Sequence, residues 1–340
     1  MSANPPRAPI DAVITWVDGS DPGHAAQLAH YLAGLGGARP AAAQPTRFGD
    51  DGEIDWCVAS ILRFAPWIRT IHIVTASQTP SLVERLRGTP QAGRVRVVDH
   101  REIFAGHEQH LPTFNSRAII TALWRIQGLA EHYIYFNDDF VLLQRLAPED
   151  FFRDGRVVAR GAWHPQTRHR PARRLLTALR RRLPNDPALA RAGDLAAQEL
   201  SARLAGFDQR FLRMEHNPFP QRRQTLERFF QQHPDLLEHN LAFRLRSSQQ
   251  FKTEVLATHL ELANGSALLD KRLRTLQLKP AEQWLPRLQA KVARADRDPR
   301  YAFACVQSLD LAPPRARACI TEWLQQRVGS LVEAARAGGP

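Results

Sequence analysis

Long hydrophobic runs and cysteines are scarce in this chain of 340 residues. No uninterrupted apolar stretch approaches the roughly 20 residues that a helix needs to cross a bilayer, so we expect no transmembrane helix. The first residues, MSANPPRAPIDAVITW, lack a basic segment followed by an apolar one, and we expect no secretory signal. The three cysteines, Cys57, Cys305 and Cys319, lie far apart and lack metal-ligand spacing. This sparse, odd set predicts reduced, buried thiols in a cytoplasmic protein.

Acidic residues are also fewer than basic ones, 34 against 46, which gives a net charge of +12. A field of this sign attracts anions of any kind, including nucleic acid, acidic lipid headgroups, nucleotide sugars and anionic polysaccharide. Most of the basic residues are arginines, whose planar guanidinium suits phosphate better than the point charge of lysine. The charge therefore favours a phosphate-bearing ligand without choosing which one.

The first 150 residues alternate between strand and helix patterns. Short runs of β-branched and aromatic residues predict buried strands at 12–17, 70–76, 95–100 and 132–139. Helical patterns lie between them, at 53–64, 79–86 and 115–124. This alternation predicts a layered, Rossmann-like α/β fold with a mostly parallel sheet. Ligands bind such sheets at the carboxyl ends of the strands, so the polar residues that follow each strand are candidates for a site.

The later part of the chain is mainly helical in pattern, with one short strand-like run near residue 303. Residues 159–206 are rich in arginine and alanine and predict a helical insert in a single α/β catalytic domain, made of 8–158 and 207–330. Within the insert, Arg173–Leu183 places four leucines on one face, with arginines around them. This pattern is typical of a basic helix on a membrane surface. A solvated helix that packs its leucines on the main domain is the alternative.

Three adjacent polar residues, Asn137, Asp138 and Asp139, end the predicted fourth strand. Two carboxylates at a strand end can hold Mg²⁺ or Mn²⁺, which takes carboxylates, water and substrate phosphates as ligands. Asn-Asp-Asp is equally suited to a turn that caps the next element. Spacing alone leaves both interpretations open.

Two further segments have the chemistry of ligand loops. After the first strand, Trp16 leads to Asp18 and Gly19, where glycine permits a backbone conformation forbidden to other residues; the alternative is an ordinary Asp-Gly turn. Asn115 and Ser116 begin a predicted helix whose free N–H groups suit an anion, or else they merely cap that helix.

His216 precedes a predicted helix, and Arg246 lies in FRLRSSQQF. A histidine near a helix start is more often structural, and a lone arginine is more often a surface charge. Neither residue predicts a function by itself.

Together these segments resemble the stealth family of bacterial capsule-polysaccharide phosphotransferases, which also includes the lysosomal-enzyme N-acetylglucosamine-1-phosphotransferase. The first two conserved regions of that family are similar to IDAVITWVDGSDP, RFGDDGEIDWCVASILRFAPWIRTIHIVTASQTP, VRVVDHREIF, LPTFNSRAI and EHYIYFNDDFVLL, in this order. HNPFPQRRQTLERFF with FRLRSSQQF looks like the third region, and YAFACVQSLD looks like the fourth. Arg117, Ile120, Gln221 and Arg222 depart from the usual family residues, so the resemblance leaves acceptor choice and some donor contacts open.

The resemblance implies transfer of a sugar 1-phosphate from a nucleotide diphosphate sugar, most simply a UDP-sugar, to an acceptor sugar hydroxyl in capsule or exopolysaccharide synthesis. Asp139, with Asp138 or Asp18, would hold Mg²⁺ or Mn²⁺ on the diphosphate. Arg246 would bind the transferred phosphate, and His216 would act as general base or, alternatively, as covalent nucleophile. Further substrate contacts implied by motif position are Trp16, Gly19, Asn115, Ser116, Arg47 and Asn137.

Two other functions remain to be separated from this one. An ordinary metal-dependent glycosyltransferase would release UDP rather than UMP. A nucleic-acid-binding protein would interleave basic residues with stacking aromatics, but the basic cluster Arg168–Arg182 contains no aromatic residue. We therefore expect a nucleotide-sugar donor, a sugar or polysaccharide acceptor and no nucleic acid. Peripheral contact with the inner membrane face remains an open alternative to a purely cytoplasmic location.

Overall fold

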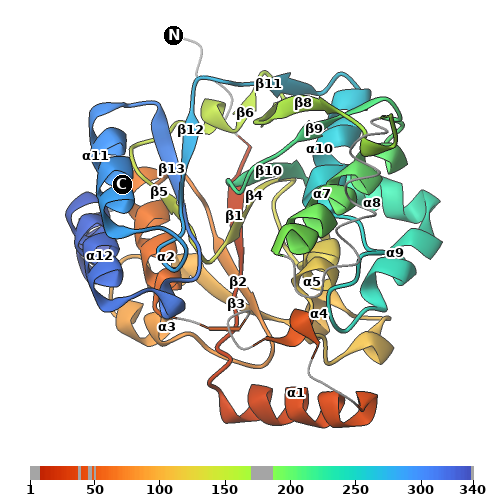
Figure 1. Cartoon of the computed structure of the whole chain (residues 1–340), viewed down its shortest axis with the longest axis horizontal. Helices are drawn as coiled ribbons and strands as arrows, with labels where there is room; N and C mark the ends of the chain where they lie inside the picture. The colour runs from red at the N-terminus through yellow and green to blue at the C-terminus, as the bar shows by residue number, and fades with distance from the viewer. Residues whose placement is uncertain (1–7, 37–39, 45–47, 50, 170–186, 338–340) are drawn as a thin grey trace.

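The structure is a computed structural model, which describes residues 8–36, 40–44, 48–49, 51–169 and 187–337. A five-stranded sheet forms its centre, in the order β10-β4-β1-β2-β3 (Figure 1). Four strands run parallel, and β10 pairs antiparallel with β4 at one edge. The strands are β1 (Ile10–Thr15), β2 (Ile71–Thr75), β3 (Val95–Asp99), β4 (His132–Asn137) and β10 (Phe219–Arg222). The mostly parallel α/β fold predicted from the sequence is confirmed.

The central strands form where apolar residues occur on both faces. β1 reads IDAVIT and β4 reads HYIYFN, and nearly all of these residues are buried. Helices cover both faces of a parallel sheet, so its strands favour such continuous hydrophobic runs. The register pairs Thr15 with Asn137, which brings the carboxyl ends of β1 and β4 side by side.

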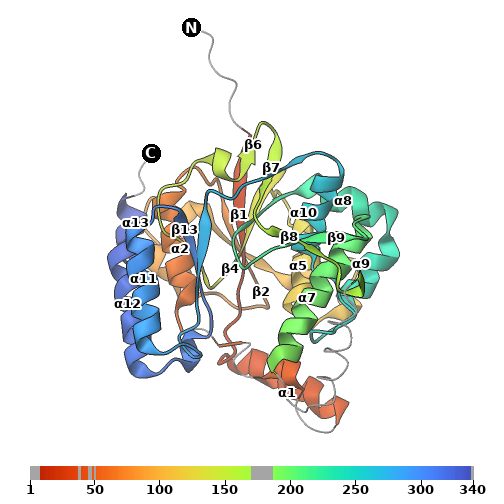
Figure 2. The ribbon, with the colours of Figure 1, turned by 45° about the horizontal axis from the view of Figure 1, so that its top comes forward.

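Helices lie in two groups on opposite sides of the sheet (Figure 2). One group comprises α2 (Glu53–Phe64), α11 (Leu285–Arg297), α12 (Pro314–Val328) and α13 (Leu331–Ala337). The other comprises α5 (Ser116–Ala122), α7 (Pro187–Leu204), α8 (Arg223–Gln232), α9 (Pro234–Leu241) and α10 (Thr253–Ala263). The described residues also form α1 (Pro22–Leu35), α3 (Ser81–Leu86) and α4 (His100–Ile103).

Three small sheets complete the described part of the chain. β5 (Phe140–Leu142) pairs antiparallel with β13 (Tyr301–Val306), which pairs parallel with β12 (Arg274–Leu278). A second sheet contains β6 (Phe152–Arg153), β7 (Arg156–Ala159) and β11 (Ala267–Leu269). β8 (Ala162–Pro165) pairs with β9 (Arg210–Arg213). The first of these sheets places the C-terminal strand β13 beside the end of β4.

The predicted helical insert, residues 159–206, begins instead at the end of strand β7 and continues with strand β8. β8 lies inside the proposed insert and its partner β9 lies outside it, so the described part of the insert is joined to the rest by strand pairing. The helical prediction rested on arginine and alanine, but in Arg156–Pro165 these residues are mixed with valine and tryptophan, which favour strands. The predicted basic helix at 173–183 lies outside the described residues.

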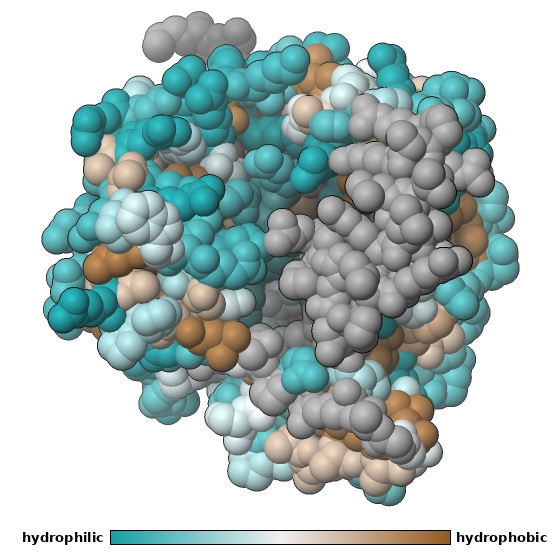
Figure 3. Space-filling view, in the orientation of Figure 1, coloured by the Kyte–Doolittle hydropathy of each residue, from teal (hydrophilic) through white to brown (hydrophobic). Residues whose placement is uncertain are grey.

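The molecular surface is largely hydrophilic on the face shown in Figure 3, with hydrophobic residues scattered over it. Among the described residues, no helix is long and apolar enough to cross a membrane. The hydrophobic side chains are instead collected in one main core around the central sheet.

Candidate active site

Asn137, Asp138 and Asp139 form the junction between β4 and β5. β4 ends at Asn137, the two aspartates form a turn, and β5 begins at Phe140. The hydroxyl of Tyr135 donates a hydrogen bond to Asn137 Oδ1, and the Asp139 N–H donates to Asp138 Oδ1 at 3.1 Å. The segment is therefore a turn, as one interpretation of the sequence had it, and this turn holds two carboxylates at the carboxyl end of β4.

The Asp139 carboxylate has one oxygen with no hydrogen-bond partner. Its Oδ1 is shielded from solvent and unpartnered, while Oδ2 accepts a hydrogen bond from the Cys305 thiol at 3.3 Å. Burial raises the pKa of Asp139 to about 6, although hydrogen bonds from Cys305, from its own backbone and from the Asn137 side chain oppose the shift. A shielded carboxylate oxygen without a partner is costly in a folded protein. It is the arrangement expected of a group that receives a ligand.

Two cysteines lie directly beneath this turn. Cys305, from β13, contacts Asp139, and Cys57, from α2, has its Sγ 3.7 Å from the Asn137 carbonyl oxygen. Burial raises the pKa of both thiols well above the usual range, and the negative charge of Asp139 adds to this shift. Both therefore stay protonated and act as donors toward the acidic turn. The sequence predicted buried thiols, and it gave no sign of this contact.

His216 lies between β9 and β10, next to the acidic turn. Its ring packs edge-on against Phe140, the residue after Asp139, with 6.4 Å between ring centroids. Burial and, to a smaller extent, the positive charges of Lys252 and Arg246 lower the pKa of His216 to about 4. Asp194 acts in the opposite direction. The imidazole is consequently neutral near pH 7, whereas the sequence-based argument assumed an ordinary pKa.

Arg246 is joined to the start of α5. Its Nε and Nη2 donate hydrogen bonds to Ser116 Oγ at 3.1 and 2.6 Å. The charge of Arg246 also acts on His216 and on Tyr135, so two residues predicted from distant segments act within one electrostatic environment. The structure thus brings Ser116, Arg246 and His216 together near the end of β4.

Asn115 holds two segments together from a fully buried position. Its Oδ1 accepts a hydrogen bond from the Arg117 N–H at 3.1 Å, which caps α5. Its Nδ2 donates to the Phe243 carbonyl at 2.7 Å and to Gln250 Oε1 at 2.9 Å. Because these bonds all stay within the protein, Asn115 positions the neighbours of Ser116 and Arg246.

The loop after β1 is held by Gln78. The Asp18 N–H donates to Gln78 Oε1 at 3.0 Å, and Gln78 Nε2 donates to the Asp18 carbonyl at 2.8 Å. Asp18 Oδ1 accepts hydrogen bonds from the Ser20 N–H and hydroxyl at 2.8 and 2.6 Å. Trp16 is buried just before this loop. The loop is therefore tightly structured, at the strand end adjacent to that of β4.

Gly19 is required for a different reason from the one predicted. Its φ angle is not in the left-handed region. A Cβ at this position would lie 2.5 Å from Phe48 Cβ and 2.6 Å from the Phe48 carbonyl oxygen, which accepts the Gly19 N–H. Close approach of two backbones, rather than an unusual conformation, thus excludes a side chain here. Arg47, one residue before Phe48, lies outside the described residues.

Sequence reasoning missed several residues that contribute to the site's electrostatics. Lys252 and Lys279 place positive charge on His216, and Asp194, from the proposed insert, places negative charge on it. Each is an ordinary charged residue in a helical or loop pattern, and no spacing in the sequence singles it out. Only the folded arrangement relates them to His216.

A divalent metal ion fits the acidic turn if substrate completes its coordination. Among the described residues, no three His, Cys, Asp or Glu side chains form a ready metal-binding group. The unpartnered Asp139 oxygen beside Asp138 is nevertheless suited to Mg²⁺, which commonly takes one or two carboxylates together with substrate phosphates and water.

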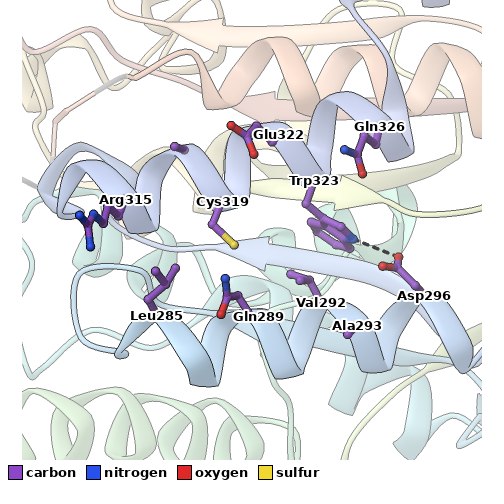
Figure 4. A pocket seen from close by; sticks show the side chains of 11 residues that line it. Leu285, Gln289, Val292, Ala293, Asp296, Arg315, Cys319, Glu322, Trp323 and Gln326 are labelled. Carbon is purple, nitrogen blue, oxygen red and sulfur yellow. Dashed lines mark hydrogen bonds between the residues drawn. The ribbon is translucent and has the colours of Figure 1, made fainter.

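A separate surface pocket of about 450 Å³ lies between α11 and α12 (Figure 4). Its lining includes Cys319 and Trp323, and the Trp323 indole donates a hydrogen bond to Asp296 at 3.0 Å. None of the predicted site residues that the structure describes lines this pocket. It is therefore distinct from the acidic turn.

The chain is thus an α/β protein with a mostly parallel sheet. The loops after β1 and β4 form its candidate ligand site, because ligands bind such sheets at the strand ends. The chain matches Stealth protein CR1, conserved region 1, over residues 8–36 and Stealth protein CR2, conserved region 2, over residues 47–159. The resemblance to the stealth family is thereby confirmed. The similarity to its third and fourth regions remains a prediction.

The chain is similar to several curated polysaccharide phosphotransferases. Exopolysaccharide phosphotransferase SCO2594 of Streptomyces coelicolor is 35% identical over 71% of this chain and 37% of that protein. SCO6021 of the same organism is 43% identical over 42% of this chain and 25% of that protein. Capsular polysaccharide phosphotransferase cps12A of Actinobacillus pleuropneumoniae is 36% identical over 45% of this chain and 40% of that protein. The matches thus span two-fifths or less of each of these relatives.

Among solved structures, galactosyltransferase LgtC in complex with donor and acceptor sugar analogues aligns with 96% of this chain and 95% of its own. The TM-score is 0.42 and the sequence identity is 13%. Likeness at this level supports no conclusion about the reaction.

Proposed function

We propose that this protein transfers a sugar 1-phosphate from a nucleotide diphosphate sugar, with a UDP-sugar as first candidate, to a hydroxyl of an acceptor sugar or polysaccharide. A phosphodiester forms and the nucleoside monophosphate leaves. The observation that carries the proposal is the unpartnered Asp139 oxygen. The next residue, Phe140, packs against His216, which is neutral and whose pKa Arg246 helps to lower. The phosphotransferase names of the relatives support the same reaction class.

In this reaction the acceptor oxygen attacks the phosphorus next to the sugar, and the bond from that phosphorus to the bridging oxygen breaks. Such phosphoryl chemistry depends mainly on positioning and on neutralising negative charge. Arg246, oriented by its two hydrogen bonds to Ser116, would bind oxygens of the transferred phosphate. Asn137, Trp16 and Gly19 would shape the donor site at the two strand ends.

Mg²⁺ or Mn²⁺ is the cofactor of this proposal. Asp139, together with Asp138 or Asp18, would hold the ion. When bound, it would neutralise charge on the diphosphate. The pKa of about 6 for Asp139 means that the carboxylate is mostly ionised at neutral pH, in the form that binds a cation.

His216 would accept the proton of the acceptor hydroxyl at a ring nitrogen. A pKa of about 4 makes it a weak base in the ligand-free protein. Bound donor brings negative charge next to Lys252, Arg246 and Lys279, the groups that disfavour protonation. That charge raises the proton affinity of the ring when it is needed. A neutral imidazole is also the form that would attack phosphorus directly, so a phosphohistidine intermediate is the second route.

The released nucleotide tests the proposal most directly. The protein is incubated with a panel of nucleotide sugars, an acceptor glycan and Mg²⁺, and the products are separated by chromatography. UMP, or the corresponding monophosphate, is the expected product. Release of UDP would instead identify an ordinary glycosyltransferase and overturn the proposal. Asp139→Asn protein is the control for contaminating hydrolases.

A further inference from the structure

One face of α7 carries a row of polar side chains that bond outside the helix. Asp194, Gln198 and Ser201 are spaced by four and three residues, which places them on the same side. Gln198 and Ser201 are buried. Gln198 Nε2 donates to Asp194 Oδ2 at 3.0 Å, so two members of the row are also bonded to each other.

Gln198 fixes the backbone just before His216. Its Nε2 donates to the Met214 carbonyl at 3.2 Å, and its Oε1 accepts the Met214 N–H at 3.0 Å. This double hydrogen bond is the one that a neighbouring strand would make. On the other side, Gln277 Nε2 donates to the carbonyl of His216 at 2.8 Å. The histidine segment is thus held at two points.

Ser201 and Asp194 fix Lys252 in the same way. Ser201 Oγ accepts the Lys252 N–H at 2.8 Å and donates to the Lys252 carbonyl at 2.9 Å. Asp194 Oδ1 lies 3.1 Å from the Lys252 ammonium, which also lies 3.3 Å from Glu254 Oε1. With its side chain largely buried and paired twice, Lys252 is a fixed charge rather than a mobile phosphate ligand.

We propose that the polar face of α7, made of Asp194, Gln198 and Ser201, is a positioning element of the transfer site that holds the His216 segment and the Lys252 ammonium in place. α7 belongs to the region that the sequence sets apart as an insert, so this region would be part of the catalytic machinery. The catalytic consequence rests on the proposed function, whereas the positioning does not.

The electrostatic part of the proposal is tested by NMR titration of His216 in the full chain, with the signal assigned by its loss in His216→Gln. The charged groups that act on the ring are Lys252, Arg246, Lys279 and Asp194. Asp194→Asn should lower the titration midpoint, and Lys252→Met should raise it. Asp208→Asn, which removes an exposed ion pair with Arg168 in the same part of the chain, is the matched control and should leave the midpoint unchanged.

The catalytic part is tested with Gln198→Leu, which changes no charge and stays informative if a charge variant fails to fold. Misplacing His216 should lower kcat by about tenfold to a hundredfold, while the dissociation constant of the donor changes by less than about twofold. Asp194→Glu should restore part of the activity that Asp194→Asn loses. Wild-type kcat in Gln198→Leu, or equal midpoints in both charge variants, overturns the proposal. Opposite shifts in a protein that transfers no sugar phosphate would support the positioning and reject the proposed function.

Discussion

Two aspartates in this protein, the buried Asp11 and the half-buried Asp139, have opposite electrostatic environments. Burial alone would raise the pKa of Asp11, but hydrogen bonds from His72, Arg69 and the Ala130 N–H lower it to about 2. Asp139 has a thiol donor on one oxygen and no partner on the other, and its pKa rises to about 6. The first aspartate is stabilised within the fold, at the start of β1. The second is left incompletely bonded, which is typical of a functional group.

Asp139→Asn should abolish sugar-phosphate transfer and stabilise the fold. The folded-state pKa of Asp139 lies above the unfolded value, so its contribution to stability falls as pH rises from about 4 to 6. At pH 7 the ionised group costs up to about 3 kcal/mol, which the amide would recover. Urea unfolding at pH 7 measures this gain, and it should be smaller at pH 4.

Asp11→Asn is the matched control for this substitution. Its carboxylate has a lowered pKa, so its stabilisation is present above pH 4 and is lost as pH falls through about 2. The amide should therefore reduce the free energy of unfolding by about 2 kcal/mol at pH 7. Destabilisation of comparable size in both variants would contradict the distinction between the two aspartates.

The Mg²⁺ requirement should depend on pH through Asp139. Below about pH 6 protons compete with the cation, so the Mg²⁺ concentration for half-maximal turnover should rise as pH falls. The Cys305 thiol lowers the pKa of Asp139. In Cys305→Ala the pH below which the Mg²⁺ requirement rises, the midpoint of this pH dependence, should therefore be higher. Cys305→Ser keeps a donor and should shift it less. A midpoint that is unchanged in Cys305→Ala would show that the thiol is not coupled to metal binding.

His216→Ala should lower kcat far more than it weakens donor binding. The ring contacts Phe140 beside the acidic turn and is proposed to exchange a proton with the acceptor. A loss of about 10²- to 10⁴-fold in kcat is expected, measured under saturating donor. Donor affinity from calorimetry provides the comparison. An increase in donor KM alone would remove His216 from the proton-transfer role.

At the scale of elements, the first loop depends on close contact between two backbones. Gly19→Ala would place a methyl group against Phe48, and displacement of the loop should cost about 1–3 kcal/mol. Donor KM should rise as Asp18 moves. Gly34→Ala in α1 is the control, because a Cβ there meets nothing within 4 Å and should leave stability unchanged or higher. The melting temperatures of the two variants provide the measurement: that of Gly19→Ala should fall, whereas that of Gly34→Ala should stay the same or rise.

The start of α5 and the segment carrying Arg246 depend on Asn115. Asn115→Ala removes the helix cap and both bonds to residues 243 and 250, and should cost at least about 1–2 kcal/mol. Arg246 should lose its orientation, which raises donor KM. Asn115→Asp keeps the oxygen that caps α5 but loses the side-chain N–H groups that bond to residues 243 and 250. The variant therefore separates the effect of the helix cap from that of the two bonds to the Arg246 segment. Equal donor KM in all three proteins would rule out a positioning role.

At the scale of the whole molecule, local patterns predicted the sheet but not its later additions. The four parallel strands, the turn at Asp139 and the strand at Tyr301–Val306 follow from short hydrophobic runs and polar breaks. β8 and β10 did not, because Ala162–Pro165 and Phe219–Arg222 contain prolines and polar residues, and they form strands by pairing with distant partners. Such pairing is a tertiary effect that a window of sequence does not contain.

In the candidate site, too, local sequence patterns predicted some features and tertiary contacts determine the others. Asp139, His216, Ser116 and Arg246 were predicted from motifs, and the structure brings them to one region. The lowered pKa of His216, the thiol on Asp139 and the role of Asp194 depend on burial and on contacts between remote segments. These properties arise only when the chain is folded, so they could not be predicted from the sequence.

The hydrogen bond between Cys305 and Asp139 joins residues that are 166 positions apart. β13, which carries Cys305, is synthesised well after β4 and β5, so a growing chain contains the acidic turn long before it contains this partner. During synthesis the Asp139 carboxylate would therefore lack its thiol donor, and its pKa should lie above that in the folded protein. The turn would reach its final hydrogen bonding only when β13 has docked beside β5.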